Sequence, residues 1–418
     1  MSGSAMLQSE VWFLLRDRAF RVWVLVVLLF SGFAVWSGLA EVAQQRQSIA
    51  FLVDADSTDR TSEFSAQGDW GSAAYYSFHL TYDPPSDFAF AAMGQRDASS
   101  WKHRLRMLAL EGQIYEHDPG NPELALIGRF DFAFFAAFVL PLVLIFLLHD
   151  LKAGERTAGR FNLLVASAGN DNRLWWTRSL LRAIGVLIAA VGPLLVGGVV
   201  SGTSAASLLG ATAMVTAYVL FWTVVCLWLG SRQHPASVIL ASLIGVWVLL
   251  GTLLPASGRV IIDRLVSVPS GADILMTQRE AVNDAWDLPV ADTMAPFVAR
   301  HPEWTGYTHT GDGFDWGWYY AFQQVGDQTT ESLSAAYREG RARRDQLAAW
   351  FAIAAPPALL ERWLQKLAGT NVEAVLDYEE SVRAFHAELR AFYYPGLFGD
   401  AAFDPARIDD LPQFSSSE

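Results

Sequence analysis

The sequence predicts a mostly α-helical, polytopic membrane protein, in which a bundle of five clear spans carries a helical domain outside the bilayer. Three observations support this fold class. Hydrophobic residues make up 52% of the chain and charged residues only 17%, which is unusual for a soluble protein. Five stretches are apolar and about long enough to cross the roughly 30 Å hydrocarbon layer. Most other residues fall into two long acidic segments.

The predicted spans are apolar throughout their interiors. Their limits are 22–40, 131–148, 183–200, 207–230 and 236–255. The first could instead be a cleaved signal peptide, but four further spans follow it and favour an uncleaved anchor. Apart from Asp131 at the edge of the second span, none contains Asp, Glu, Lys, Arg or His. Ion-coupled transport is therefore disfavoured, since it requires ionisable groups at membrane depth.

The distribution of Lys and Arg predicts the orientation. Residues 1–21, 149–182 and 231–235 hold ten Lys/Arg against five Asp/Glu, whereas 41–128 hold six against thirteen and 256–418 hold thirteen against twenty-four. The positive-inside rule places the basic N-terminal segment and the 149–182 loop in the cytoplasm and the acidic segments outside. The net charge of -13 thus comes from the outer segments, and it argues against a nucleic-acid partner.

The two outer segments, 41–130 and 256–418, are expected to form one helical periplasmic domain. In the first, Trp101, Leu105 and Tyr115 belong to an apolar series at helical spacing that predicts a packed helix, which "HDPGNP" at 117–122 ends. In the second, an apolar seam predicts a C-terminal amphipathic helix. Its members are Val375, Tyr378, Val382, Phe385, Leu389 and Phe392.

Two other stretches of the second outer segment have alternative interpretations. The aromatic, glycine-rich residues 304–320 favour a folded lid or subunit contact over a ligand-binding loop. Residues 347–360 are apolar but short, and Pro356 and Pro357 interrupt them. They favour a core or interfacial segment, with a re-entrant or distorted sixth span as the alternative. Without that span, the C-terminus remains outside.

No catalytic residue and no metal site are predicted. Neither H-E-x-x-H nor G-x-S-x-G occurs, and Asp131 and His149 are expected to be interfacial anchors. The outer histidines and methionines, among them His79 and His301, make a copper or zinc site conceivable, but they lack a recognised ligand spacing. Cys226 is the only cysteine, so no disulfide framework exists. The G-x-x-x-x-G-K-[ST] phosphate loop is also missing, so ATP would have to be bound by a partner.

The loop after the second span, residues 150–164, resembles a rigid handle. Gly154 and Gly159 would let the chain turn parallel to the membrane. Four charged side chains would offer polar contacts to a partner. Three apolar side chains would form an apolar plug that inserts into that partner. These residues are Asp150, Glu155, Arg156 and Arg160, then Phe161, Leu163 and Leu164. An amphipathic connector that rests on lipid headgroups is the alternative.

Residues 121–183 resemble the second span, coupling loop and third span of ABC-2 type transporter permeases. The closest branch is the one associated with maturation of multi-copper enzymes such as nitrous-oxide reductase. Residues 9–21, 71–97 and 355–395 resemble the same branch. In the loop, the first acidic residue, the first glutamate and two leucines of the family's pattern are matched. The family's second glutamate, its Gly-Thr pair and its proline are not matched.

The resemblance implies a permease subunit of an ATP-driven ABC complex in a bacterial inner membrane. Two ATPase subunits would carry the ATP and Mg²⁺, and a second permease copy or a related permease would complete the complex, with a periplasmic or substrate-binding protein as a further partner. The 150–164 residues named above would form the ATPase-contacting coupling helix. Arg16, Arg18 and Arg21 would lie along the inner leaflet and the ATPase. Family members typically have six spans, and the expectation of five here favours an unlike permease partner.

Two other functions are kept as alternatives. One is a membrane-anchored assembly or receptor protein that receives no energy from ATP. The other is a membrane-embedded enzyme, which would require catalytic side chains near the bilayer. Co-purification with an ATPase separates the permease from the first alternative. A substitution of His or Asp that abolishes turnover but preserves assembly would identify the second.

Overall fold

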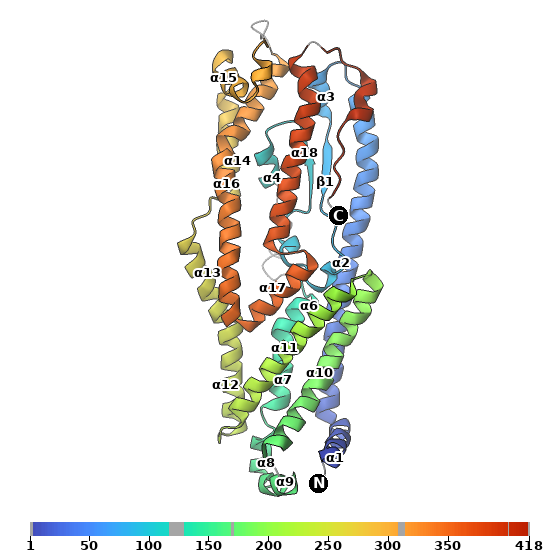
Figure 1. The fold of residues 1–418 in the computed structure, drawn as a ribbon, viewed down its shortest axis with the longest axis vertical. Helices are drawn as coiled ribbons and strands as arrows, with labels where there is room; N and C mark the ends of the chain where they lie inside the picture. Colours follow the sequence, from blue (N-terminus) through green and yellow to red (C-terminus); the bar gives the residue numbers. More distant parts are fainter. Residues whose placement is uncertain (1–2, 117–128, 169–170, 308–313, 400, 417–418) are drawn as a thin grey trace.

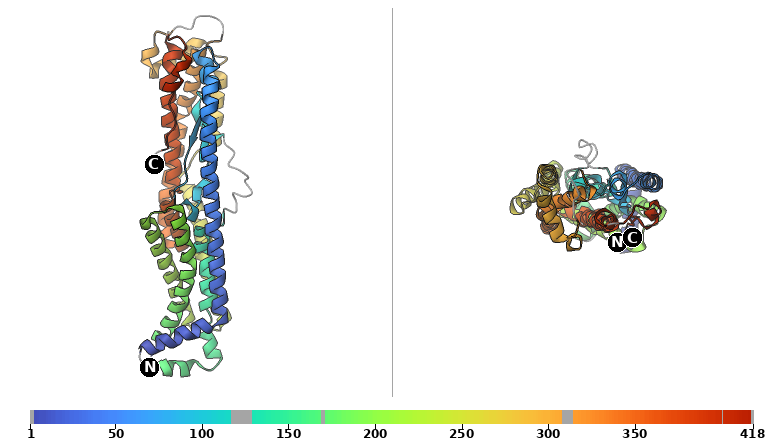
Figure 2. Two further views of the ribbon diagram at one scale, coloured as in Figure 1. Left: turned by 90° about the vertical axis from the view of Figure 1, so that its right-hand side faces the viewer. Right: turned by 90° about the horizontal axis from the view of Figure 1, so that it is seen from above.

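The structure is a computed structural model that describes residues 3–116, 129–168, 171–307, 314–399 and 401–416. The described part is mostly α-helical and forms a long, narrow body (Figure 1). Its N-terminal helix lies at one end, and the helices of the C-terminal region make up the other half, as two further views show (Figure 2).

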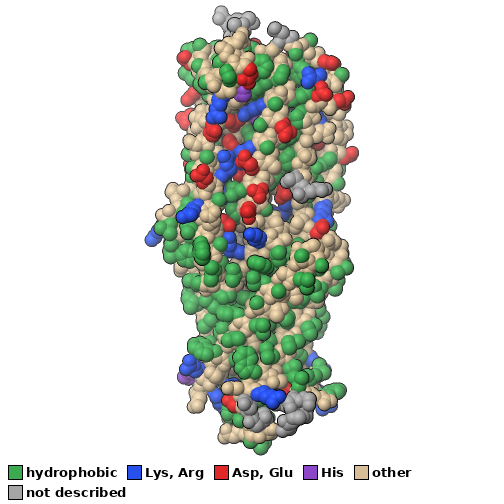
Figure 3. Space-filling model, viewed as in Figure 1, with side chains coloured by type: hydrophobic (Ala, Val, Ile, Leu, Met, Phe, Trp, Pro, Cys, Tyr) green, Lys and Arg blue, Asp and Glu red, His purple; other side chains and the backbone are tan. Residues whose placement is uncertain are grey.

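Five helices of the described part are long and apolar enough to cross a membrane, which agrees with the predicted number of clear spans. They are α2 (Arg18–Ser65), the α6–α8 run (Phe132–Thr157), α10 (Asp171–Ser201), α11 (Ala205–Gly230) and the α12–α13 run (Ala236–Leu265). Hydrophobic side chains dominate the lower half of the face in Figure 3, whereas charged side chains gather in the upper half and near the lower tip. This distribution indicates a membrane protein with a single apolar band.

The first spanning helix continues far beyond the predicted limit at residue 40. No proline or glycine occurs between residues 40 and 65, so nothing in the local sequence ends the helix before Ser65. The α2 helix therefore runs without a break from the apolar band into the other half of the molecule (Figure 2).

Two spans contain a π-helical turn. The second span consists of α6 (Phe132–Phe134), the π turn η3 (Phe135–Val139) and α7 (Leu140–Leu148), and the fifth of α12 (Ala236–Val248), the π turn η4 (Leu249–Leu253) and α13 (Leu254–Leu265). Pro141 follows η3 and has no N–H for the carbonyl of Ala137. The Tyr218 hydroxyl donates to that carbonyl at 2.6 Å, and Trp247 Nε1 donates to the carbonyl of Phe138 at 3.2 Å. Neighbouring helices thus satisfy the backbone groups that the π turn exposes.

The two outer segments fold together at one end of the spans. We call the described residues of 41–116 and 266–416 the helical domain. Its longer helices are the distal half of α2, α14 (Gly271–Asp284), α15 (Val290–Arg300), α16 (Trp316–Ala354) and α18 (Val372–Phe398). Its shorter elements are α3 (Trp70–Tyr76), η1 (Ala89–Ala91), η2 (Gly94–Asp97), α4 (Leu110–Tyr115), η5 (Pro302–Trp304) and η6 (Pro405–Asp410). An aromatic core that includes Phe64, Phe297 and Tyr393 holds it together.

The helix predicted from Trp101 to Tyr115 is wrong for most of its length. Residues Lys102–Leu105 form strand β2, which pairs antiparallel with β1 (His79–Tyr82), with His79 opposite Leu105. Only Leu110–Tyr115 is helical, and the "HDPGNP" stretch that should end the helix lies outside the described residues. Leu105 is buried because β2 packs against α4 and α18, so its apolar character reflects the packing of a strand and not a helical face.

The structure also shows where the other stretches discussed for the C-terminal half of the chain lie. The predicted C-terminal amphipathic helix is present as part of α18, and its apolar seam is buried except for Phe392, which is partly buried. Residues 347–360 form the end of α16, a break at Ala355 and the beginning of α17 (Pro356–Ala368). The α17 helix then packs across α11 and both π turns. Of the aromatic stretch 304–320, residues 308–313 lie outside the described part, and Trp316 begins α16.

Candidate functional site

Five short or terminal elements meet at the tip of the bundle, opposite the helical domain (Figures 1 and 2). They are α1 (Gly3–Arg16), the start of α2, α8 (Ala153–Thr157), α9 (Phe161–Ala168) and the start of α10. We call this group the tip. Both acidic outer segments lie at the other end, as the predicted orientation requires, and the side of the membrane on which each end lies stays a prediction.

The chain turns between α8 and α9. Gly159 has a φ of +68°, a left-handed conformation that glycine adopts without strain and that ends α8. The Arg160 guanidinium then donates to the Glu155 carboxylate, with Nε to Oε2 at 2.8 Å. Gly154 makes room for the preceding turn, because a Cβ at this position would lie 2.8 Å from the Asp150 carboxylate.

The three residues of the predicted apolar plug do not all point the same way: two are packed inside the tip and one is at the surface. Phe161 stacks on Trp175 of α10, with ring centroids 5.7 Å apart and an interplanar angle of 8°. Leu164 packs on the same small cluster. Leu163 points outward and is 74% exposed. Two of the three apolar side chains therefore anchor α9 to α10, and only the third is presented to a partner or to lipid.

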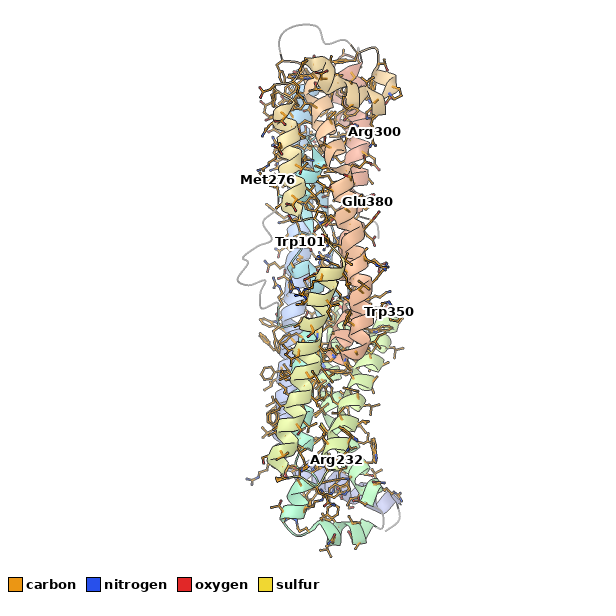
Figure 4. The ribbon with its side chains drawn as sticks, turned by 90° about the vertical axis from the view of Figure 1, so that its left-hand side faces the viewer. Trp101, Arg232, Met276, Arg300, Trp350 and Glu380 are labelled. Carbon is orange, nitrogen blue, oxygen red and sulfur yellow. The ribbon has the colours of Figure 1, made fainter. Side chains whose placement is uncertain are left out.

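Arg156 also serves an internal contact. Its guanidinium lies over the Phe161 ring at 4.9 Å from the centroid and donates to the Arg232 carbonyl at 3.0 Å. The first contact is a cation–π interaction. Because Arg232, labelled in Figure 4, lies in the turn between α11 and α12, this hydrogen bond joins α8 to that turn.

An ion-pair network that the sequence analysis missed connects three helices of the tip. Arg178 of α10 makes two hydrogen bonds to Glu10 of α1, at 2.8 and 3.0 Å, and lies 3.8 Å from Glu155 of α8. The Arg178 side chain is only 8% exposed. Nothing in the local sequence distinguishes Arg178 from Arg173 and Arg182 on the same helix, since its partners are 168 and 23 positions away.

The basic N-terminal residues lie at the tip, and their contact with the inner leaflet and an ATPase, which the resemblance implies, stays a prediction. Arg16, Arg18 and Arg21 are exposed at the junction of α1 and α2, and Asp17 caps α2 by accepting from the backbone amides of Ala19 and Phe20. On α1, Trp12 is 57% exposed and lies under the Arg16 guanidinium. The tip thus presents cationic and large apolar side chains together, a combination suited to a membrane surface or a protein partner.

The candidate metal residues do not form a cluster. Among the described residues, no group of three or more His, Cys, Asp and Glu side chains could hold a metal ion. His79 is fully buried in the helical domain, and this burial lowers its pKa to about 3. His301 Nε2 accepts from the Gln324 side-chain amide, and His301 Nδ1 donates to the Glu303 carboxylate at 2.9 Å. His117 and His309 lie outside the described residues.

One family model matches the chain. Residues 273–417 match a family described as a domain of unknown function (DUF3526). The matched residues begin in α14 and include α15 to α18, so they cover the second segment of the helical domain and none of the spans. No curated protein and no solved structure matches the chain.

Proposed function

We propose that the chain is the membrane-spanning subunit of an ATP-driven ABC complex of the ABC-2 type. In this proposal the tip faces the cytoplasm of a bacterial cell and docks two separate ATPase subunits with their ATP and Mg²⁺. The helical domain faces the periplasm, where it changes conformation or passes on a substrate. The chain itself catalyses no reaction.

The observation that carries this proposal is the position of Glu155. It pairs with Arg160 at the start of α9 and lies near Arg178, which holds α1. Phe161 and Leu164 add apolar contacts between α9 and α10. A partner that pushes on α8 and α9 would therefore move the second and third spans together, because these short helices are fastened to both.

A continuous path leads from the tip to the helical domain. The second span passes from α8 through α7 to η3, and α17 lies directly against η3. The α17 helix in turn connects α16 to α18. A π turn is a frequent place for a functional bend in a helix, so movement of α7 would be transmitted to the helical domain through this contact.

The surface of the fifth span is exposed enough to contact a second permease subunit. Only 11% of its most apolar window is buried within the chain, against 28% to 61% for the other four. Such a poorly covered span fits the paired arrangement of the proposed complex, in which a second copy or a related permease would lie beside α12 and α13.

The test begins with the native complex. The full chain is tagged in its own host and captured in mild detergent, and its partners are identified by mass spectrometry. We expect a co-purifying subunit that carries a G-x-x-x-x-G-K-[ST] phosphate loop. Capture of the wild-type chain without any such ATPase would contradict the proposal and favour the membrane-anchored assembly protein.

A double variant then tests the docking surface. Glu155→Ala combined with Arg160→Ala is expected to reduce ATPase recovery and ATP hydrolysis by about tenfold, because two charged contacts are lost. Arg232→Ala removes an exposed charge from the neighbouring loop and serves as the control. Equal recovery and activity for the double variant and the wild type would show that α8 is not the docking element.

A further inference from the structure

A large cavity lies where the fifth span meets the helical domain. Its volume is about 570 Å³, within the range of small-molecule sites. Its walls come from α13, from the last turns of α16 and from the start of α17. The charged residues that line it are Arg259, Asp263, Arg341, Arg344, Asp345 and Arg362.

The arginines outnumber the carboxylates, and one of them has spare donors. Arg362 is held by two hydrogen bonds to the Asp345 carboxylate, at 2.8 and 2.9 Å. Arg344 donates to the Val266 carbonyl and pairs with Asp263 at 3.1 Å. Arg341 donates to the Glu379 carboxylate at 3.2 Å. The Arg259 side chain is 86% exposed, and it lies 3.9 Å from the Asp263 carboxylate, too far for a hydrogen bond. Arg259 is therefore the cation at this cavity best able to bind an added anion.

Part of the cavity lining is apolar. Pro255, Phe351 and Ala352 contribute to it, and Phe351 lies against Gly258 of α13. One site thus combines a guanidinium group with a hydrocarbon surface. A ligand that satisfies both must carry an anionic group joined to an apolar one.

The cavity lies at the level where the apolar band ends. In α13 the last apolar turns lead directly to Arg259, Asp263 and Arg264. Nearby on α16, Trp350 is 73% exposed and Ile353 is 61% exposed. Trp350 lies close to the middle of the long axis (Figure 4). Exposed tryptophan beside arginine is typical of the bilayer interface, so lipid headgroups would surround the mouth of this cavity.

We propose that the cavity binds the headgroup of an anionic phospholipid from the adjoining leaflet. The phosphate would contact Arg259, and the first carbons of the acyl chains would follow Pro255 and Phe351 onto the exposed apolar face of α13, where Val260 is 52% exposed. The cavity holds the headgroup end only, and the chains remain in the bilayer. This proposal does not depend on coupling to an ATPase.

Native mass spectrometry of the full chain in a releasable detergent tests the proposal. The protein is titrated with palmitoyl-oleoyl phosphatidylglycerol, with the phosphatidylcholine of the same chains, and with glycerol 3-phosphate. We expect retention of one phosphatidylglycerol molecule about fivefold more tightly than of phosphatidylcholine, since one interfacial cation contributes on this scale. We expect no comparable adduct with glycerol 3-phosphate.

Three variants locate the site. Arg259→Gln is expected to weaken phosphatidylglycerol retention by about fivefold, and Ala348→Phe, which fills the cavity, to reduce it without a change in charge. Arg264→Gln is the matched control, because Arg264 is exposed on the same helix and does not line the cavity. Equal loss in Arg259→Gln and Arg264→Gln would overturn the proposal in favour of general surface attraction. Equal affinity for glycerol 3-phosphate and phosphatidylglycerol would identify a soluble-anion site instead.

Discussion

At the scale of single residues, the tip is organised by charges that are largely withdrawn from solvent. Arg178 occupies a position flanked by Trp175 and Phe13, with its guanidinium 5.4 and 5.6 Å from the two ring centroids. Its side chain and that of Glu10 are 8% and 12% exposed. Removing one member of such a pair is costly, because the other is left with a poorly solvated charge.

The Arg178→Gln variant is expected to release α1 from α10. Loss of both hydrogen bonds to Glu10 should make the chain more sensitive to trypsin at Arg16, the last residue of α1, and at Arg18 and Arg21, in the first turn of α2. The measurement is the rate of N-terminal cleavage in detergent, with cleavage expected to be about tenfold faster. Arg232→Gln is the control. Unchanged cleavage would mean that apolar packing alone holds α1.

At the scale of elements, α17 determines the environment of an unusual carboxyl group. This helix lies across the ends of the spans and places Glu361 near Asp131, the residue that caps α6. Burial, together with the nearby Asp131 carboxylate, raises the pKa of Glu361 to about 7. Burial likewise raises the pKa of Asp131 to about 6. Two carboxyl groups at the base of the helical domain are therefore poorly accommodated in their charged forms.

The sign of the resulting pH dependence can be predicted. Because the folded pKa of Glu361 lies above its ordinary value of 4.5, the folded state binds more protons between these two values, and stability falls as the pH rises through them. Glu361→Gln removes this effect. We expect its Tm to exceed that of the wild type at pH 8 and the difference to vanish near about pH 5.

The measurement is thermal unfolding in detergent across this pH range. Glu280→Gln, which neutralises an exposed carboxylate on α14, is the control and should show no such convergence. A Tm difference between Glu361→Gln and the wild type that is constant with pH would contradict the predicted ionisation.

At the scale of the whole molecule, α2 joins the bundle to the helical domain at a very close backbone approach. A Cβ at Gly38 would lie 1.9 Å from the carbonyl oxygen of Phe90 in η1. No side chain larger than hydrogen fits without moving this backbone. The first outer segment is thereby seated directly against the outer part of the first span.

Gly38→Ala is expected to destabilise the protein by about 2 kcal/mol through this overlap. Gly32→Ala is a matched control on the same helix, since a Cβ there meets nothing within 4 Å. The control should be neutral or slightly stabilising, because alanine favours a helix over glycine. Comparison of the two Tm values in detergent checks the prediction, and equal values would show that η1 can move away from α2 at little cost.

The features of the candidate site that depend only on neighbouring residues could be predicted from the sequence. The turn at Gly159 and the charged and apolar composition of 150–164 are visible in the sequence, and the structure places them together at the tip. The inward orientation of Phe161 and the link from Glu155 through Arg178 to Glu10 were not predictable. They depend on how α1, α8 and α10 approach one another in space.

The sequence alone determined the helical character, the number of clear spans and the amphipathic α18. The hydrophobicity of a stretch and its helical periodicity depend only on the residues within that stretch. Tertiary structure decided the rest. Residues 102–105 became a strand through pairing with 79–82, and α17, which begins at Pro356, packs against α11 and both π turns. These outcomes arise from contacts between segments that are distant in the sequence. The free energy of such a contact depends on both segments and cannot be predicted from either one alone.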